Sequence, residues 1–387
     1  MPTSLAPVSA YAPFALVALA IALGATPLAA ALARRLDIMD HPDQLLKPHA
    51  RPTPYLGGLA IALAWMAAAC LALLLPPGAA GPPARHLAAV MLPILGGGLA
   101  LVLLGMLDDA GDLPPRIRLA ISGLVVVLMM LGTGAGLHLP RAIADLFGAG
   151  GWPTWLGPAL ALPLGVFIVL GACNSSNLID GLDGLCAGVA GVMGVAYTLL
   201  AALALTDAGA AADPPASFIG RPETLAVLPL ALGLAGAAFG FLYHNFNPAR
   251  VFMGDAGSLL IGYVCGVCIL LLAQTGELRW VVGGVIAFGL PIFDTALALY
   301  RRWRSGKPIF AGDRSHFYDQ LVQRGFSVRA TALICYAVAA LYGALGLAVA
   351  WMSAAGAAAY FLAVVAASAA TAAVLGFTRP ERRRRMI

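Results

Sequence analysis

Residues 162–173 read LPLGVFIVLGAC and residues 174–185 read NSSNLIDGLDGL, so an apolar run changes abruptly into a stretch with two asparagines, two aspartates and two glycines. The apolar run has the character of a membrane-spanning helix, which needs about 20 mostly apolar residues. The polar stretch then lies where the chain leaves the bilayer. This junction predicts a membrane protein with polar chemistry at the end of a span.

Similar apolar runs recur along the whole chain. Of 387 residues, 61% are hydrophobic and 11% are charged. Backbone groups in lipid must be satisfied within their own segment, and the runs are too long for barrel strands, so we expect helices. We predict an all-α polytopic membrane protein, with residues 1–387 as a single membrane-embedded domain. The eleven expected spans are residues 12–33, 57–76, 87–107, 117–138, 155–173, 185–206, 224–243, 256–273, 280–300, 330–351 and 354–376.

The basic residues predict the orientation of the chain. No positive charge precedes the first run, so we interpret it as a span and not as a cleaved signal peptide. An odd number of spans puts the termini on opposite sides, and the positive-inside rule then favours an outside N-terminus and a cytoplasmic C-terminus. Residues 379–387 form a basic tail that suits a topology anchor at anionic lipid headgroups. Of the 23 basic residues, the ones left outside are Arg85, Arg141, Arg221 and Arg279.

The same orientation gathers the acidic motifs at the cytoplasmic ends of spans. Outside loops carry only scattered acidic residues. One face of the protein therefore carries clustered groups that could catalyse a reaction or bind a ligand, and the other face does not. The motifs are DD at 108–109, DGLD at 180–183, GD at 254–255 and DR at 313–314.

Asp108 and Asp109 stand side by side at the end of the third span, before a Pro-Pro turn and two arginines. In a structural interpretation Asp109 or Asp112 caps the next helix and the arginines extend to the membrane interface. That explains one aspartate but not an adjacent pair, whose ionisation is opposed by desolvation and like-charge repulsion. We therefore favour a functional pair, relieved by a divalent cation or a basic substrate group.

Asp255 lies between glycines in GDAGS, directly before an apolar run. It could cap that helix, with Ser258 completing the first turn. However, Asn247 nearby offers another oxygen, and carboxylates with carbonyl oxygens suit Mg²⁺ bound beside substrate phosphates. We favour a metal and substrate site. In the opening stretch, which we expect to be a cytoplasmic loop, Asn177, Asp180 and Asp183 would form a further wall of that site.

Two basic segments could complete the site with groups that bind anions. Lys47 precedes the second span, and Arg314 and His316 follow the ninth. Because these three are embedded among Pro, Gly and Asp, we predict phosphate or substrate contacts for them. For residues 301–304 the positive-inside bias is a sufficient explanation. Asp294, within the ninth span, is an intramembrane acid and hence a further candidate, although Thr295 could share its hydrogen bonds.

Acids that hold Mg²⁺ and cations that hold phosphate, all at one membrane face, indicate phosphoryl transfer with a membrane-dissolved second substrate. The main alternative from another class is a transporter, because intramembrane carboxylates mark ion pathways. A transporter predicts polar groups at mid-membrane and access from both faces, which the one-sided acids disfavour. A structural scaffold would not need these acidic corners. We expect no nucleic-acid partner.

Taken together, the motifs resemble the polyprenyl-phosphate N-acetylhexosamine-1-phosphate transferases of glycosyltransferase family 4. This family includes the phospho-N-acetylmuramoyl-pentapeptide transferase of peptidoglycan synthesis. Each motif is modest alone, but together they are specific and follow the family order. The matching segments are KPHARPTPYLGG (47–58), DDAGDLPPRIRL (108–119), NSSNLIDGLDGL (174–185), NPARVFMGDAGS (247–258), PIFDT (291–295) and DRSH (313–316).

The resemblance implies transfer of a sugar-1-phosphate from a UDP-N-acetylhexosamine to undecaprenyl phosphate, with release of UMP, at the cytoplasmic face of the bacterial inner membrane. It implies Mg²⁺ as cofactor and Asp255 as its ligand. Asp108 and Asp109 would be the catalytic pair and further metal ligands, with Asp108 deprotonating or orienting the lipid phosphate. Lys47, Asn177, Asp180 and Asp183 would contact the substrates. The resemblance leaves open whether transfer occurs in one step or two, and whether the chain forms a homodimer.

The chain departs from the family pattern after the ninth span. Many members carry H-x-H-H or HHH there, whereas residues 316–319 read HFYD. Because this loop is associated with sugar recognition, the departure argues against the peptidoglycan enzyme and against plain N-acetylglucosamine. We favour an enzyme that initiates a surface glycan such as the O-antigen of lipopolysaccharide, using a modified or 6-deoxy N-acetylhexosamine. The peptidoglycan-precursor transferase is the alternative.

Overall fold

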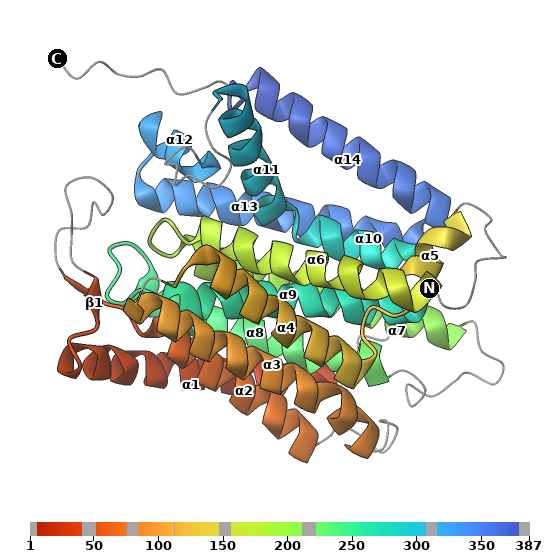
Figure 1. The fold of residues 1–387 in the computed structure, drawn as a ribbon, viewed down its shortest axis with the longest axis horizontal. Coiled ribbons are helices and arrows are strands. Elements are labelled where there is room, and N and C mark those ends of the chain that lie inside the picture. Colours follow the sequence, from red (N-terminus) through yellow and green to blue (C-terminus); the bar gives the residue numbers. More distant parts are fainter. Residues whose placement is uncertain are drawn as a thin grey trace.

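The structure, a computed structural model, describes residues 6–40, 52–75, 84–111, 113–146, 156–210, 222–306 and 316–378. These residues are almost entirely helical, which confirms the all-α prediction (Figure 1). Two short strands pair antiparallel beside the bundle. The elements are α1 (Ala6–Arg35), β1 (Met39–Asp40), β2 (Thr53–Pro54), α2 (Gly57–Leu74), α3 (Ala84–Gly111), α4 (Pro115–Thr133), α5 (Leu139–Leu146), α6 (Leu156–Ile179), α7 (Leu185–Ala210), α8 (Pro222–Asn245), α9 (Gly254–Leu272), η2 (Ala273–Thr275), α10 (Leu278–Ala287), α11 (Gly289–Arg304), α12 (Phe317–Gln323), α13 (Val328–Leu347), η3 (Ala348–Trp351) and α14 (Ala354–Val374).

The expected number of spans agrees with the helices. Within the described ranges, ten helices are long and apolar enough to cross a membrane, and α10 with α11 makes an eleventh if the pair is one span. The prediction of one continuous helix over residues 280–300 is wrong, because this pair is bent by 68°. Pro291 explains the break: it lacks an N–H, and its ring clashes with the carbonyl four residues earlier, at Ala287, where α10 ends.

Helix α9 lies at the centre of the bundle, and its spanning segment is 100% buried. Helices α2, α3, α6 and α8 all pack against it. Gly262 and Gly266, one turn apart, allow α6 to approach closely. A Cβ on Gly262 would lie 2.4 Å from the Cα of Cys173, and one on Gly266 would lie 2.8 Å from the Cα of Val169. Small residues at this spacing are a common device of membrane helix packing, and here they hold the central helix firmly.

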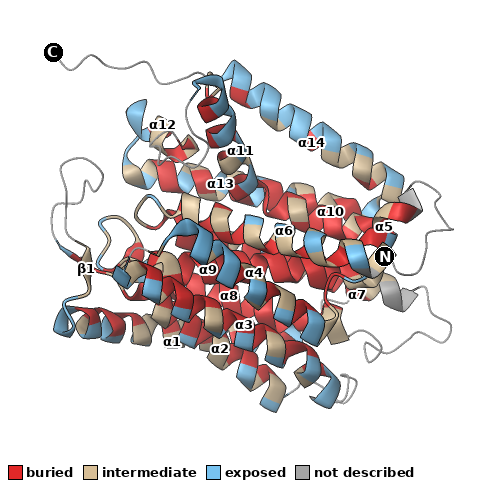
Figure 2. Cartoon of the chain, viewed as in Figure 1, coloured by how far each residue is buried: buried red, intermediate tan, exposed pale blue. Residues whose placement is uncertain are grey.

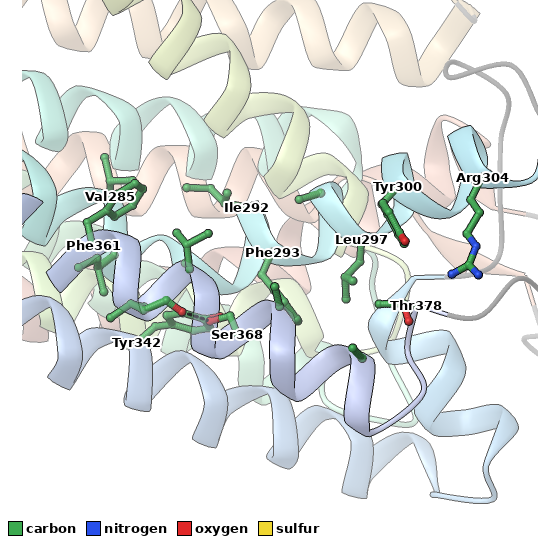
Figure 3. A pocket seen from close by; sticks show the side chains of 17 residues that line it. Val285, Ile292, Phe293, Leu297, Tyr300, Arg304, Tyr342, Phe361, Ser368 and Thr378 are labelled. Carbon is green, nitrogen blue, oxygen red and sulfur yellow. Dashed lines mark hydrogen bonds between the residues drawn. The ribbon is translucent and has the colours of Figure 1, made fainter. Parts of the chain in front are cut away.

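The last helices lie at the edge of the bundle. Only 11% of the spanning segment of α14 is buried, and Figure 2 shows this helix mostly exposed. A groove of about 600 Å³ runs between α10 and α11 on one side and α13 and α14 on the other (Figure 3). Its walls are mainly apolar, with Phe293, Leu297 and Phe361 among them, and Arg304 lies at one end. Tyr342 and Ser368 satisfy each other within it by a 2.7 Å hydrogen bond.

The polar motifs meet at one end of the bundle, where β1 and α12 also lie (Figure 1). Asp109 on α3 and Asn177 on α6 both bond to Asp255 at the start of α9. The expectation that these three corners share one end is therefore confirmed. The motif at residues 313–314 and the tail at residues 379–387 lie outside the described residues.

Candidate active site

The amino end of α9 is capped by a carboxylate from another helix. Asp109 accepts hydrogen bonds from the backbone N–H groups of Asp255, at 2.8 Å, and Ala256, at 3.4 Å. The first N–H groups of a helix lack partners within it, and the helix dipole favours a carboxylate there. The idea that Asp255 caps its own helix is wrong, since the N-cap is Met253. The idea that Asp109 caps the following span is also wrong, since the N-cap of α4 is Pro114 with no side-chain cap.

Glycines permit this close contact between α3 and α9. Gly254 has a φ of +70°, which side chains other than glycine rarely adopt, and a Cβ there would lie 2.5 Å from Oδ2 of Asp109. A Cβ on Gly105 would lie 2.4 Å from the backbone nitrogen of Ala256. The GD motif and the DD motif are thus complementary parts of one junction.

One nitrogen of Arg118 joins two of the predicted catalytic carboxylates. Its Nη1 donates to Oδ2 of Asp108 at 2.6 Å and to Oδ2 of Asp255 at 2.8 Å. Asp108 is buried and the other two side chains are half-buried, so these charges interact more strongly than they would in bulk water. Asp108 also accepts a hydrogen bond from the backbone N–H of Leu113, which closes the turn into α4.

Arg118 was not among the predicted site residues, and the structural interpretation of this motif assigned both of its arginines to the membrane interface. That interpretation fits the exposed Arg116 and is wrong for Arg118. The available signal was the Pro-Pro pair at residues 114–115, which reverses the chain between α3 and α4. A reversal brings residues before it and after it onto facing helices, and Asp108 and Arg118 lie on either side of this one.

Asn177 connects α6 to the same junction. Its Nδ2 donates to Oδ1 of Asp255 at 2.6 Å and to Oγ of Ser258 at 3.1 Å. The opening polar stretch was expected to be a loop, but α6 continues through Ile179, and only residues 180–184 form the turn. The helix tolerates these asparagines because their side chains find partners: Asn174 donates to the carbonyl of Leu170, one turn earlier.

Asp180 lies half-buried in the turn that follows α6. Burial raises the pKa of its carboxyl well above the usual value, and the carboxylates of Asp255 and Asp109 raise it further. Burial and the same carboxylates also raise the pKa of the Tyr55 hydroxyl. Both residues are therefore within electrostatic reach of the acidic junction.

A polar cavity of about 660 Å³ opens beside the junction. The pairing of β1 with β2 brings acidic residues and Tyr55 to its rim, which the sequence did not reveal, although Tyr55 lies within a quoted motif. Three of the predicted site residues line it, together with Arg118. The lining residues are Asp37, Ile38, Met39, Asp40, Tyr55, Asp108, Asp109, Ala110, Leu113, Arg118 and Asp255.

Two other predicted substrate contacts bond to each other on the flank of the junction. Oδ2 of Asp183 accepts hydrogen bonds from Nδ2 of Asn247, at 2.8 Å, and from the backbone N–H of Ala249, at 2.9 Å. Asn245 adds a further tie by accepting from the backbone N–H of Gly184 at 3.0 Å. These bonds fix the turn after α6 to the segment before α9, so Asp183 and Asn247 position the site.

His316 is held by Asp294. Its Nδ1 lies 2.7 Å from Oδ2 of Asp294, whose Oδ1 accepts the backbone N–H of Phe317. The His316 ring stacks on Tyr318, with ring centroids 5.4 Å apart, and the Tyr318 hydroxyl donates to the carbonyl of Leu178 at the end of α6. Asp294 thus orients a predicted site residue beside the polar turn. Thr295 does not share its bonds but donates to Ser175 instead.

Three of the residues considered for the site from the sequence have no described position. Lys47, Asp112 and Arg314 lie outside the described residues. Of the others, the structure joins Asp108, Asp109, Asn177 and Asp255 directly, with Asp180 nearby.

The junction suits a magnesium ion by its donor set. Among the residues that the structure describes, no three His, Cys, Asp or Glu side chains already form a metal-binding group. However, Asp108 and Asp255 direct one oxygen each at a single cationic nitrogen. Mg²⁺ in phosphoryl-transfer sites commonly takes only one or two protein carboxylates and completes its shell with water and substrate phosphates. Two converging carboxylates match that requirement.

The chain is similar to known proteins of one family. The model of glycosyl transferase family 4 matches residues 91–273, which include the DD, NSSN and GD motifs. A probable undecaprenyl-phosphate N-acetylglucosaminyl 1-phosphate transferase of Bacillus subtilis is 32% identical over 84% of this chain and 81% of the relative. An undecaprenyl-phosphate alpha-N-acetylglucosaminyl 1-phosphate transferase of Yersinia pestis is 30% identical over 81% and 78%. A decaprenyl-phosphate N-acetylglucosaminephosphotransferase of Mycobacterium leprae is 29% identical over 83% and 79%. The chain therefore belongs to glycosyl transferase family 4, among the polyprenyl-phosphate sugar-1-phosphate transferases.

Proposed function

We propose that this protein transfers an N-acetylhexosamine-1-phosphate from a UDP-sugar to undecaprenyl phosphate at the cytoplasmic face of the bacterial inner membrane. The observation that carries the proposal is the junction of Asp108, Asp255 and Arg118, because it gathers carboxylates and a cation at one polar cavity in a membrane protein. The printed names of the relatives, which pair a polyprenyl phosphate with N-acetylglucosamine phosphate, support it.

In the proposed reaction, an oxygen of the lipid phosphate attacks the β-phosphorus of the UDP-sugar. The bond between that phosphorus and the oxygen bridging to the α-phosphate breaks, and UMP leaves with the bridging oxygen. Such transfer depends mainly on positioning and charge neutralisation. Asp108 and Asp255 would hold Mg²⁺, which when bound neutralises phosphate charge. Asp109 holds the amino end of α9, and Asn177 fixes the second oxygen of Asp255.

The apolar groove beside α11 supports a lipid acceptor. Its walls suit a hydrocarbon chain, and Arg304 adds a positive charge at one end (Figure 3). Helix α11 carries both a wall of the groove and a polar pair, because Phe293 and Leu297 line the groove while Asp294 between them bonds to His316.

The proposed donor is an N-acetylhexosamine, and the product would initiate a surface glycan. The relatives carry N-acetylglucosamine in their names, and they do not favour the peptidoglycan-precursor alternative. Because HFYD has a single histidine where many family members have three, we include modified and 6-deoxy N-acetylhexosamines among the proposed donors. The positive-inside distribution supports a cytoplasmic site and C-terminus.

The test is UMP release by the detergent-purified protein with undecaprenyl phosphate and Mg²⁺. The donor panel would comprise UDP-N-acetylglucosamine, UDP-N-acetylgalactosamine, 6-deoxy derivatives and UDP-MurNAc-pentapeptide. We expect lipid-dependent, EDTA-sensitive release with an N-acetylhexosamine donor. Release only with the pentapeptide donor would select the alternative, and no release with any donor from folded protein would contradict the proposal.

A further inference from the structure

We propose that Arg118 is an exchangeable internal cation: it occupies the position between Asp108 and Asp255 in the metal-free protein, yields it when a divalent cation binds, and then faces the substrate phosphates. The inference rests on the proposed function for its substrate but not for the exchange itself.

The geometry places one positive nitrogen where a metal would be expected. Nη1 of Arg118 contacts Oδ2 of Asp108 at 2.6 Å and Oδ2 of Asp255 at 2.8 Å, and these are the two carboxylates that converge. The remaining oxygens are engaged elsewhere: Oδ1 of Asp108 by Leu113, and Oδ1 of Asp255 by Asn177. The two Oδ2 atoms are therefore the ones for which cations compete.

The two cations exclude each other. A magnesium ion bound to these oxygens would lie about 2.1 Å from each, well inside the distance of the guanidinium nitrogen. Two like charges that share the same pair of oxygens repel strongly in a partly desolvated site. Metal binding must therefore displace Nη1 of Arg118, and the guanidinium lowers the apparent metal affinity for as long as it occupies the position.

The metal-free site needs such a cation. Asp108, Asp109 and Asp255 meet at one point, with Asp180 within electrostatic reach. Without a positive charge these carboxylates would repel one another at the amino end of the central helix. Arg118 thus keeps the converging geometry in place before the metal arrives.

The displaced guanidinium would stay at the site. Arg118 lines the polar cavity together with Tyr55 and Asp109, and its side chain is 24% exposed, so it has space to turn toward a ligand there. A guanidinium can bind phosphate through two parallel hydrogen bonds, which a lysine ammonium cannot reproduce. Arg118 would then bind the carboxylates of Asp108 and Asp255 in the protein without metal, and the substrate phosphates once the metal is bound.

The first experiment compares Arg118→Gln with Arg116→Gln, an exposed control two residues away on the same helix. Mn²⁺ binding to purified protein without substrates is measured by electron paramagnetic resonance. We expect Arg118→Gln to bind Mn²⁺ more tightly, on the order of tenfold, and to have a lower Tm in EDTA that added metal restores. The control should match the wild type. Equal or weaker binding by folded Arg118→Gln would overturn the exchange.

A second measurement uses the wild type and does not depend on a variant that folds. Phenylglyoxal modification of Arg118 is followed by mass spectrometry with and without Mg²⁺, with Arg116 as the internal reference. Faster modification of Arg118 alone upon metal addition supports its release, and an unchanged or slower rate contradicts it. Neither assay uses substrate, so tighter metal binding combined with no UMP release would refute the proposed function while retaining the exchange.

Discussion

The polar cavity and the apolar groove have similar volumes, about 660 and 600 Å³, but opposite chemistry and opposite surroundings. The cavity lies at the amino end of α9, the most buried spanning helix. The groove lies along α14, the least buried. The buried centre of the bundle carries charges that converge through direct hydrogen bonds. The exposed edge offers an apolar surface, and a hydrocarbon chain needs no fixed hydrogen bonds there.

The largest effect should come from the cavity. Asp255→Asn removes a charge from the junction while preserving side-chain size, and we expect UMP release to fall by about 10³-fold. Glu223→Gln, at the start of α8 and away from the junction, should keep wild-type activity. Size-exclusion profiles should match the wild type for both. An active Asp255→Asn would break the assignment of the cavity as the catalytic region.

A steric change at the same junction should have the next largest effect. In Gly254→Ala the new methyl meets Oδ2 of Asp109, and the residue must also adopt a φ of +70°. We expect turnover to fall by about 10²-fold, because small displacements of reacting groups are costly. Gly111→Ala has open space around it and should have little effect. Equal kinetics in the two variants would show that the junction is less rigid than the geometry requires.

Filling the groove with a larger side chain should change the KM for the lipid acceptor and leave the KM for the donor unchanged. Ala369→Trp places a large ring among its walls, whereas Ala370→Trp puts the same ring on an exposed position of α14 that does not line the groove. For Ala369→Trp we expect the KM for undecaprenyl phosphate to rise by about tenfold, with the KM for the UDP-sugar unchanged, because only apolar contacts are blocked. A rise in the donor KM, or identical behaviour of the control, would contradict separate regions for the two substrates.

The smallest effect concerns the turn beside the cavity. Because the pKa of Asp180 is raised in the folded protein, its ionisation costs stability above its ordinary pKa, and the cost is complete above the raised pKa. At pH 4, near the ordinary value, the cost is mostly absent. Asp180→Asn should therefore raise Tm by about 2 °C at pH 8 and hardly at pH 4. An equal gain at both pH values would indicate a packing effect.

The sequence predicted the helices and the shared end of the acidic motifs because both depend on local patterns. Apolar runs define spans without knowledge of packing. The DD, NSSN and GD motifs are polar groups that are costly to bury in lipid, so their place at the ends of spans can be predicted. The contacts between these motifs could not be predicted, because they depend on tertiary structure. Nothing local shows that Asp109 caps α9, or that Asp183 and Asn247 bond to each other and not to the cavity. The break at Pro291 was visible in the sequence, but its apolar neighbours outweighed it in the hydropathy pattern.

The most direct test of the central claim is the fate of the β-phosphate. Wild-type protein would be supplied with undecaprenyl phosphate, Mg²⁺ and an N-acetylhexosamine donor labelled with ³²P at the β-position, and the products separated into organic and aqueous phases. If the acidic junction catalyses phosphoryl transfer, the label moves into the lipid phase and unlabelled UMP remains in water. If the label stays in water as UDP while sugar enters the lipid, the protein is a glycosyl-transfer enzyme and the account is wrong.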